Sequence, residues 1–537
     1  MHPQYPPFRL ATLGAILVIA AFLLFTRLGH YAFWDDEAVT ALGAKGILLT
    51  GNTSVLMDHG NIVAYHNGEI ISGFLDRVDP PLETYVTAVS FALCKPGTLA
   101  GRLPFALAGL GVFALVLLWV RRESWAVFLV VAIGFVTNVS LILYCRQCRY
   151  YALSIFFSVA FVYVYWRWKP SARNLLILAA ISVLLFASNY LDYLALYACL
   201  AIDYFFWKRK EWPLTARNAM LLLGPQVILN GIIGYVWNPL RTQYGGSVWT
   251  SSLEDRLDLF FMYWRDMNAC EFLAIPMLLL AFGIGVRLRH GWLVRGCVAL
   301  LVYVAVITLI SPQLIKPGVY ANVRYVVAVI PLAIALEAGA LCILFQRRAI
   351  FAIGAAILIF GTNLFNGGPL LAWGFQSTIL CYAGELLHPP PEPYTPTAQW
   401  INEHVPEGSS IWVEPDYMTY PLMFYAPRAL YAWQLSWPPR PDFAGLPPIH
   451  FMGQEPPDYL VAFGPSAGLM AQTIGKMNRP DIGYQRVATI DTCWRDMYRP
   501  ELFLRTFTPV IGYDPRTLAI YIFQRTKPPI AAPAKVR

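Results

Sequence analysis

Residues 101–120 of the chain, GRLPFALAGLGVFALVLLWV, decide the fold class. Nineteen of these twenty side chains are uncharged, and the run is long enough to cross the apolar core of a bilayer as one helix. The one charged residue, Arg102, stands at its start, where a long basic side chain can reach the polar boundary of the membrane. The segment therefore predicts a membrane-spanning helix.

Apolar runs of similar length recur on both sides of this segment. The composition agrees, because 57% of the 537 residues are hydrophobic and only 13% are charged, against about 25% charged residues in soluble domains. The sequence predicts a polytopic α-helical membrane protein with about eleven spans. They lie near residues 10–27, 101–120, 124–142, 150–166, 172–189, 191–207, 218–237, 272–286, 292–311, 325–345 and 349–366.

Basic residues gather in alternate connections between the predicted spans, as at Arg121-Arg122 and Lys208-Arg209-Lys210. The positive-inside rule places these connections in the cytoplasm, so we expect the N-terminus inside a plasma or inner membrane. Residues 28–100 then form a long outer loop, and the region after the last span lies outside. Most of the basic residues behind the net charge of +8 lie in these short connections and do not form one patch, so the sequence does not predict a nucleic-acid partner.

The chain changes character after about residue 370, where no run approaches spanning length. We predict a transmembrane catalytic domain over residues 1–370 and an extracytoplasmic soluble domain over residues 371–537. Within the latter, the pattern predicts a helix from residue 397 to about 405 and strands at 410–413, 457–464 and 519–523, which is typical of an α/β domain. It could cover an active cavity, bind an acceptor, or only stabilise the protein.

Three consecutive acids, Asp35, Asp36 and Glu37, follow Trp34 directly after the first predicted span. One interpretation is structural, because acids at the start of a helix cap it and are favoured by its dipole. The other is catalytic: a carboxylate at the outer boundary can accept a proton from a hydroxyl group.

Cationic residues recur at the same side of the membrane. Arg146 and Arg149 are three residues apart, which on a helix would place two guanidinium groups on one face, a suitable arrangement for phosphate. Lys316 and Arg324-Tyr325 precede the tenth predicted span. Each of these bases could instead be a solvated residue at the membrane boundary.

Taken in order, the motifs resemble those of the C-type membrane glycosyltransferases, in the branch of the protein O-mannosyltransferases and the lipid A aminoarabinose transferases. The resemblance covers roughly residues 10 to 370. Relatives often have Lys or His where this chain has Asp79, so a phosphate contact from that position is not expected to carry over. The matching elements are Asp36-Glu37, Pro80-Pro81-Leu82, Arg102-Leu103-Pro104 and Arg324-Tyr325 with Ile330-Pro331.

The resemblance implies a polyprenyl-phosphate sugar donor and a single displacement with inversion at the anomeric carbon. Asp36 would be the base, with Glu37 or Asp35 orienting it. The acceptor could be a lipid, a protein or a polysaccharide, and a divalent cation remains possible although no metal ligands are predicted. The residues expected to bind substrate are Asp79, Arg102, Arg146, Arg149, Lys316, Arg324 and Tyr325.

Two other functions remain open. A transporter or flippase of lipid-linked sugars could use the same boundary cations without needing a base, although transporters commonly place functional charges inside their spans. A scaffold for assembly would leave the clustered acids unexplained.

Overall fold

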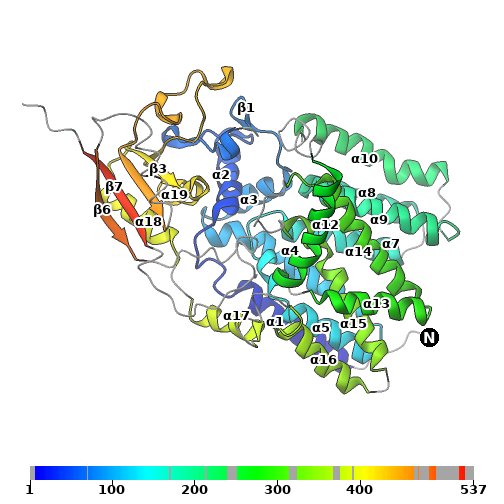
Figure 1. Ribbon diagram of the computed structural model, residues 1–537. Coiled ribbons are helices and arrows are strands. Elements are labelled where there is room, and N and C mark those ends of the chain that lie inside the picture. The colour runs from blue at the N-terminus through cyan, green and yellow to red at the C-terminus, as the bar shows by residue number, and fades with distance from the viewer. Residues whose placement is uncertain are drawn as a thin grey trace, which may run out of the picture.

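The computed structural model describes residues 7–68, 71–167, 171–211, 215–238, 251–271, 273–313, 323–346, 348–366, 375, 377–389, 392–464, 470, 483–491 and 519–526. A bundle of helices forms one side of the molecule and a small sheet with its own helices forms the other. Helices α2 (Asp35–Thr50) and α3 (Leu82–Leu93) lie between these two parts (Figure 1).

Each predicted span coincides with one helix or with one broken pair of helices. Over residues 125–145 the pair is α5 and α6, and over residues 323–344 a 3-10 segment, η4, runs directly into α15. The elements of the bundle are α1 (Pro7–Phe25), α4 (Thr98–Val120), α5 (Trp125–Thr137), α6 (Val139–Cys145), α7 (Tyr151–Arg167), α8 (Ala172–Ser188), α9 (Tyr190–Asp203), η3 (Tyr204–Lys208), α10 (Ala216–Val236), α12 (Leu253–Cys270), α13 (Ile275–Arg287), α14 (Gly291–Ile310), η4 (Val323–Val329), α15 (Ile330–Leu344) and α16 (Ala349–Gly361).

Among the described residues, four helices are long and apolar enough to cross a membrane, or five when a bent pair counts as one span. Five of the other six predicted spans are shorter apolar helices, and the sixth, at residues 191–207, is α9 followed by η3. The structure therefore supports a polytopic membrane protein without confirming eleven crossings. Helix α12 occupies a stretch that we expected to be an outer connection. Its hydropathy is low because it carries acids such as Glu254 and Asp258.

The bent pair is α5 and α6, whose axes differ by 63°. Asn138 lies at the break, and its side-chain oxygen accepts a hydrogen bond of 2.8 Å from the Leu141 N–H at the start of α6. The side-chain amide of Asn138 donates to the Glu271 carbonyl oxygen at 3.0 Å. Backbone groups freed inside a membrane need partners of this kind, so one asparagine stabilises the bend.

Connections that the sequence placed on one side of the membrane also meet in space. Arg9, before the first span, donates to the carbonyl oxygens of Arg121 and Glu123 at 3.1 and 3.0 Å. Arg295, near the start of the ninth predicted span, binds Asp203, near the end of the sixth, through two hydrogen bonds of 2.7 Å. Both contacts join segments that the charge pattern assigns to the same side of the membrane, and that assignment stays a prediction.

The predicted outer loop is folded. It contains η1 (Asp58–Gly60), η2 (Tyr65–Gly68) and a two-stranded antiparallel ribbon of β1 (Ile71–Ser72) and β2 (Leu75–Asp76), in addition to α2 and α3. Helix α2 starts after Trp34, which has an extended backbone, and ends at Gly51, whose φ of +75° suits glycine and lets its N–H bond the Ile47 carbonyl oxygen at 2.7 Å.

The C-terminal part contains a five-stranded sheet in the order β4-β3-β5-β7-β6. Strands β4, β3 and β5 are parallel, whereas β7 pairs antiparallel with β5 and with β6. The helix and the three strands predicted here are α18, β3, β5 and β7. The elements are α17 (Thr378–Leu387), α18 (Tyr394–His404), β3 (Ser410–Glu414), η6 (Asp416–Met418), α19 (Thr419–Tyr425), β4 (Leu430–Tyr431), η7 (Pro441–Phe443), η8 (Pro448–His450), β5 (Tyr459–Phe463), β6 (Gly483–Ile490) and β7 (Ile520–Thr526).

This sheet region packs onto the loop that carries α2. The Asn61 side-chain amide donates to the carbonyl oxygens of Pro427 and Ala429 at 3.0 and 2.9 Å, and its oxygen accepts from the Tyr431 N–H at 2.9 Å. Helix α19 packs against α2, and buried apolar side chains of the bundle and the sheet form one continuous core. The C-terminal region therefore supports the part of the chain where the acids lie.

Candidate active site

Helix α2 presents its three acids to the interior of the protein. Asp35, Asp36 and Glu37 form its first turn, and each is at most 1% exposed. The positive end of the helix dipole favours carboxylates there, as the structural interpretation of the sequence held. Burial of three neighbouring carboxylates still requires partners, and each acid has a different environment.

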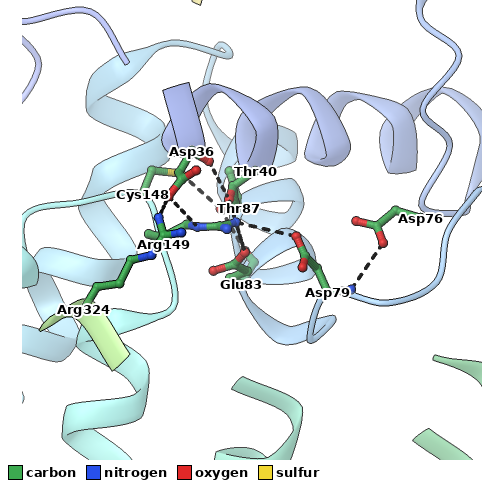
Figure 2. A network of polar contacts seen from close by, with 9 residues as sticks. All are labelled: Asp36, Thr40, Asp76, Asp79, Glu83, Thr87, Cys148, Arg149 and Arg324. Atoms are coloured by element: carbon green, nitrogen blue, oxygen red, sulfur yellow. Dashed lines mark hydrogen bonds and ion pairs between the residues drawn. The ribbon is translucent and has the colours of Figure 1, made fainter. Parts of the chain in front are cut away.

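Asp36 lies between two arginines from distant parts of the chain (Figure 2). The Arg324 guanidinium, in η4, forms a close ion pair with Asp36 Oδ2, while Arg149 Nε lies 4.0 Å from the same oxygen. The ring of Tyr325 lies beside Arg324, with its centroid 5.5 Å from Cζ. Three predicted site residues, Asp36, Arg149 and Arg324, thus meet at one carboxylate.

Arg149 extends this group of charges away from Asp36. Its Nη1 donates to Glu83 Oε1 at 2.7 Å and to Thr40 Oγ1 at 3.1 Å, and lies 3.9 Å from Asp79 Oδ2. The Thr40 hydroxyl also lies 3.3 Å from Glu83 Oε1. Figure 2 shows the resulting chain of polar contacts from Arg324 to Asp76.

Two carboxyl groups of this network have shifted pKa values. Burial raises the pKa of Glu83 to about 7, although the neighbouring Arg149 opposes this shift. Burial and the adjacent Asp79 raise the pKa of Asp76 to about 7, in spite of hydrogen bonds from the backbone N–H groups of residues 78 and 79. Burial thus dominates over the stabilising partners at both groups.

Glu37 and Arg102 form a separate and fully buried ion pair. Arg102 Nε and Nη2 donate to the two carboxylate oxygens of Glu37 at 2.8 and 2.5 Å, and the Cys148 N–H donates to Glu37 Oε1 at 2.7 Å. The remaining donors of Arg102 bind backbone carbonyl oxygens between Leu28 and Ala32. Both residues were expected to face substrate or the base, but these contacts describe a structural pair.

Arg146 also differs from the expectation. Helix α6 ends at Cys145 and α7 starts at Tyr151, so Arg146 and Arg149 lie in the turn between two helices and do not share a helical face. Arg146 donates to the carbonyl oxygens of Leu23, Leu24 and Thr26 at 2.7 to 2.9 Å. It thereby satisfies carbonyl groups that the end of α1 leaves without intrahelical partners.

Asp35 faces the C-terminal region. Burial and the nearby carboxylates of Asp35 and Asp416 raise the pKa of Tyr420, which belongs to α19. Lys316 was also expected in the site but lies outside the residues that the structure describes.

A pocket lies beside the network, between α2, α3 and the loop that joins them. Asp76, Asp79, Glu83 and Arg149 line it together with Thr40 and Trp237, and the empty space in and around it, counting space open to solvent, is about 520 Å³. Asp36 and Arg324 are not among its lining residues, so Arg149 connects this pocket to Asp36. Within the described ranges, no three His, Cys, Asp or Glu side chains converge on a position for a metal ion.

Three members of this network, Thr40, Asp76 and Glu83, were not predicted. Thr40 stands four residues after Asp36, which puts both on one face of α2, so helical spacing could have indicated it. Glu83 follows the Pro-Pro element and could have been read as a helix start. Only the fold brings it to Arg149.

The fold and the site define a polytopic membrane protein with the C-type glycosyltransferase fold that the motifs resembled. No protein-family model and no curated protein sequence matches the chain. Among solved structures, the chain is similar to ArnT, a lipid A aminoarabinose transferase, from Cupriavidus metallidurans. The structure of ArnT bound to undecaprenyl phosphate has 14% sequence identity and a TM-score of 0.52, with 96% of this chain and 97% of ArnT covered.

The apo state of the same ArnT gives an identity of 15% with the same TM-score and coverage. An archaeal oligosaccharyltransferase, AglB from Archaeoglobus fulgidus, in complex with an inhibitory peptide and a dolichol-phosphate, has a TM-score of 0.49 and 12% identity over 90% of this chain and 73% of its own. At this level of identity the similarity to ArnT establishes the fold, and the activity has to be argued from the site.

Proposed function

We propose that this protein is a glycosyltransferase of the cell membrane that moves a sugar from a polyprenyl-phosphate donor to an acceptor hydroxyl at the outer face. One observation carries the proposal: a buried carboxylate, Asp36, is held between Arg149 and Arg324. A base for the acceptor and cations for a phosphate leaving group are the two requirements of this reaction.

In the proposed reaction Asp36 accepts the proton of the acceptor hydroxyl as its oxygen attacks the anomeric carbon. The bond between that carbon and the phosphate oxygen breaks, and the electron pair leaves with the lipid phosphate. Attack opposite to the leaving group inverts the anomeric configuration. Arg149 and Arg324 neutralise the departing phosphate, which is the largest change of charge in the reaction.

Asp36 is paired with the guanidinium groups of Arg149 and Arg324. A carboxylate paired with two guanidinium groups is a weak base, because both cations favour its ionised form. A donor phosphate competes for the same arginines, so donor binding would loosen the pairs and make Asp36 more basic. The base would then become active only when a donor is present.

The other predicted residues receive different roles. We propose that Glu37 and Arg102 position α2, that Arg146 holds the end of α1, and that Asp35 contacts the C-terminal region. Asp79 is an anion, so it suits acceptor hydroxyl groups better than phosphate. Lys316 and Tyr325 remain candidates on the donor side, with Tyr325 supporting Arg324.

The proposal covers hexosyl or pentosyl donors and leaves the acceptor open among lipids, proteins and polysaccharides. The similarity to a protein solved with undecaprenyl phosphate supports a lipid-linked donor. Residues 371–537 would lie outside the membrane and brace the site through α19. The proposed reaction uses guanidinium groups as the phosphate counterions, and a divalent cation could add to them.

The test compares Asp36→Asn with the wild type for transfer of a labelled sugar from a polyprenyl-phosphate donor to membrane extracts. We expect transfer to fall at least about 1,000-fold, since the base is lost while the shape of the site is kept. Asp58→Asn, an exposed acid of the same outer loop, is the control and should retain activity. Normal transfer by a folded Asp36→Asn protein would disprove the assignment.

The alternative, a transporter or flippase of lipid-linked sugars, has one supporting feature in the bent pair α5 and α6, because broken helices are typical of transporter binding sites. Purified protein in vesicles separates the two functions. Movement of the donor lipid across the bilayer without any glycosylated product would favour the transporter.

A further inference from the structure

The pocket between α2 and α3, which we call the α2–α3 pocket, lies beside the Asp36 network, and Arg149 is the lining residue to which the proposed chemistry gives a step. Its polar lining residues include Thr40, Asp76, Asp79, Glu83 and Arg149, and Trp237 forms an apolar wall. The Trp237 ring contacts the edge of Tyr85, with 6.2 Å between ring centroids, and the Arg77 guanidinium lies 5.2 Å from its centroid. The wall is therefore held in place from two directions.

Charge is unevenly distributed across the network. Four carboxyl groups, those of Asp36, Asp76, Asp79 and Glu83, face two guanidinium groups, and both guanidinium groups already contact Asp36. Among the described residues that line the α2–α3 pocket, the carboxylates share one cation, Arg149, while Arg77 lies on Trp237 at the pocket wall. Buried carboxylates are stabilised by partners of opposite charge, so the pocket favours a positively charged ligand.

Glu83 provides a second, independent observation. The residue is 1% exposed, and its Oε1 accepts from Arg149 and Thr40. The backbone N–H of Tyr150 also stabilises the carboxylate, but Oε2 is buried without a partner at full hydrogen-bond geometry among the described residues. An unsatisfied carboxylate oxygen is costly inside a protein, and a donor group on a ligand would remove that cost.

The form of the ligand follows from the spacing of the acids. Because the described acids do not converge around one point, a bare metal ion would lack ligands, whereas an ammonium group with neighbouring hydroxyl groups has several separate donors. The apolar face of a sugar ring would pack against Trp237.

The charges also indicate whether the donor or the acceptor carries the ammonium group. The donor phosphate belongs on the Asp36 side of Arg149, between Arg149 and Arg324, and the carboxylates on the pocket side of Arg149 would repel it. An acceptor can place its hydroxyl near Asp36 while the rest of it lies beyond Arg149.

On the basis of the proposed function, we propose that the α2–α3 pocket is an acceptor subsite that binds a protonated amine next to the hydroxyl group to be glycosylated. Asp79 and Glu83 accept hydrogen bonds from the ammonium group, and Trp237 supports the ring that carries it. The enzyme would then select amine-bearing acceptors over their N-acetylated forms.

Two matched probes test the subsite. Octyl glucosaminide and octyl N-acetylglucosaminide differ in the charge of one nitrogen, and their binding to purified full-length protein in nanodiscs is measured near pH 7 by calorimetry. We expect the glucosaminide to bind at least about tenfold more tightly, as one charge-assisted hydrogen bond to a buried carboxylate provides. Asp79→Asn and Glu83→Gln should abolish this preference, while Glu123→Gln, which changes an exposed acid in the turn between α4 and α5, should keep it.

Equal binding of the two probes, or a preference that survives in both pocket variants, would overturn the subsite. Competition with the glucosaminide by a short polyprenyl-phosphate amino sugar, with the same dependence on Glu83, would place the amine on the donor and overturn the acceptor assignment. A failure of the acceptor subsite can be distinguished from a failure of the proposed function. Binding needs no chemistry, so an Asp36→Asn protein should keep the preference while losing sugar transfer.

Discussion

Asp36 and Arg324 are 288 residues apart in the chain and form an ion pair in the interior of the folded protein. The pair joins the first turn of α2 to η4, which continues directly into α15. It connects the candidate base to a cation that can bind the leaving group, so the two roles in the proposed reaction depend on one contact.

Replacement of Arg324 by alanine should reduce kcat/KM for the donor by about 100-fold or more, because a phosphate counterion and the partner of Asp36 are both lost. Transfer at several donor concentrations measures the effect. Arg428→Ala removes an exposed arginine of the C-terminal region and should leave the kinetics unchanged. An unaltered donor KM and kcat in Arg324→Ala would contradict the role of this residue.

Glu37→Gln should act on folding, because it leaves Arg102 buried without its carboxylate. Breaking a buried ion pair by removing one partner costs about 3–5 kcal/mol. The melting temperature in detergent and the yield of folded protein should both fall, while the activity per folded molecule changes little. A protein of normal stability that has lost transfer would instead make Glu37 part of the chemistry.

Arg146→Met should weaken the packing of the end of α1 while sparing donor binding. Up to three carbonyl groups lose a donor, at a cost on the order of 1–3 kcal/mol for each group left unsatisfied. The melting temperature measures the loss of stability. The KM for the donor separates a structural role of Arg146 from a role in phosphate binding. A strongly raised donor KM in this variant would restore the phosphate-binding role that the sequence first indicated.

Glu83 predicts a dependence of stability on pH. Its folded pKa, about 7, is higher than its ordinary value of 4.5, so the folded state binds the proton more tightly. The stability of the outer loop should therefore decrease as pH rises from about 4.5 to about 7, by an amount on the order of a few kcal/mol. Thermal inactivation between pH 4.5 and 8 measures this slope, which Glu83→Gln should reduce and Glu123→Gln should not.

Asn61→Ala should loosen the C-terminal region from the outer loop. Three hydrogen bonds are lost, and about 2–3 kcal/mol is expected because the backbone groups they satisfied are partly buried. Limited proteolysis should cleave the C-terminal region faster, with Gln399→Ala, an exposed side chain of α18, as the control. Unchanged cleavage would show that the packing of α19 on α2 is sufficient.

The positions of the helices could be predicted well, because hydrophobic length is a local property of the sequence. Residues 125–145 show the limit, since the run is long enough for one span but Asn138 provides partners for a bend that hydropathy does not register. The strands at 410–413 and 457–464 followed from alternation and composition, whereas their order in the sheet did not.

The site was predicted in part. Grouping the motifs expected on one side of the membrane singled out Asp36, Arg149 and Arg324, which lie together in the structure. Charge alone could not decide which of the acids each arginine would contact. Arg102 and Arg146 carry the same charge as Arg149 but bind Glu37 and backbone carbonyl groups, and this difference depends on where each guanidinium lies in three dimensions. Glu83 escaped prediction because its partner is 66 residues away.

The contact between Asn61 and the segment that ends at Tyr431 has a consequence for how the protein is made. Synthesis proceeds from the N-terminus, so the loop that bears Asp36 is inserted long before its support from β4 exists. Arg324 arrives between these two events. The proposed catalyst would therefore stay incomplete during most of its own translation, and its activity would begin only when the last quarter of the chain has been made and has folded.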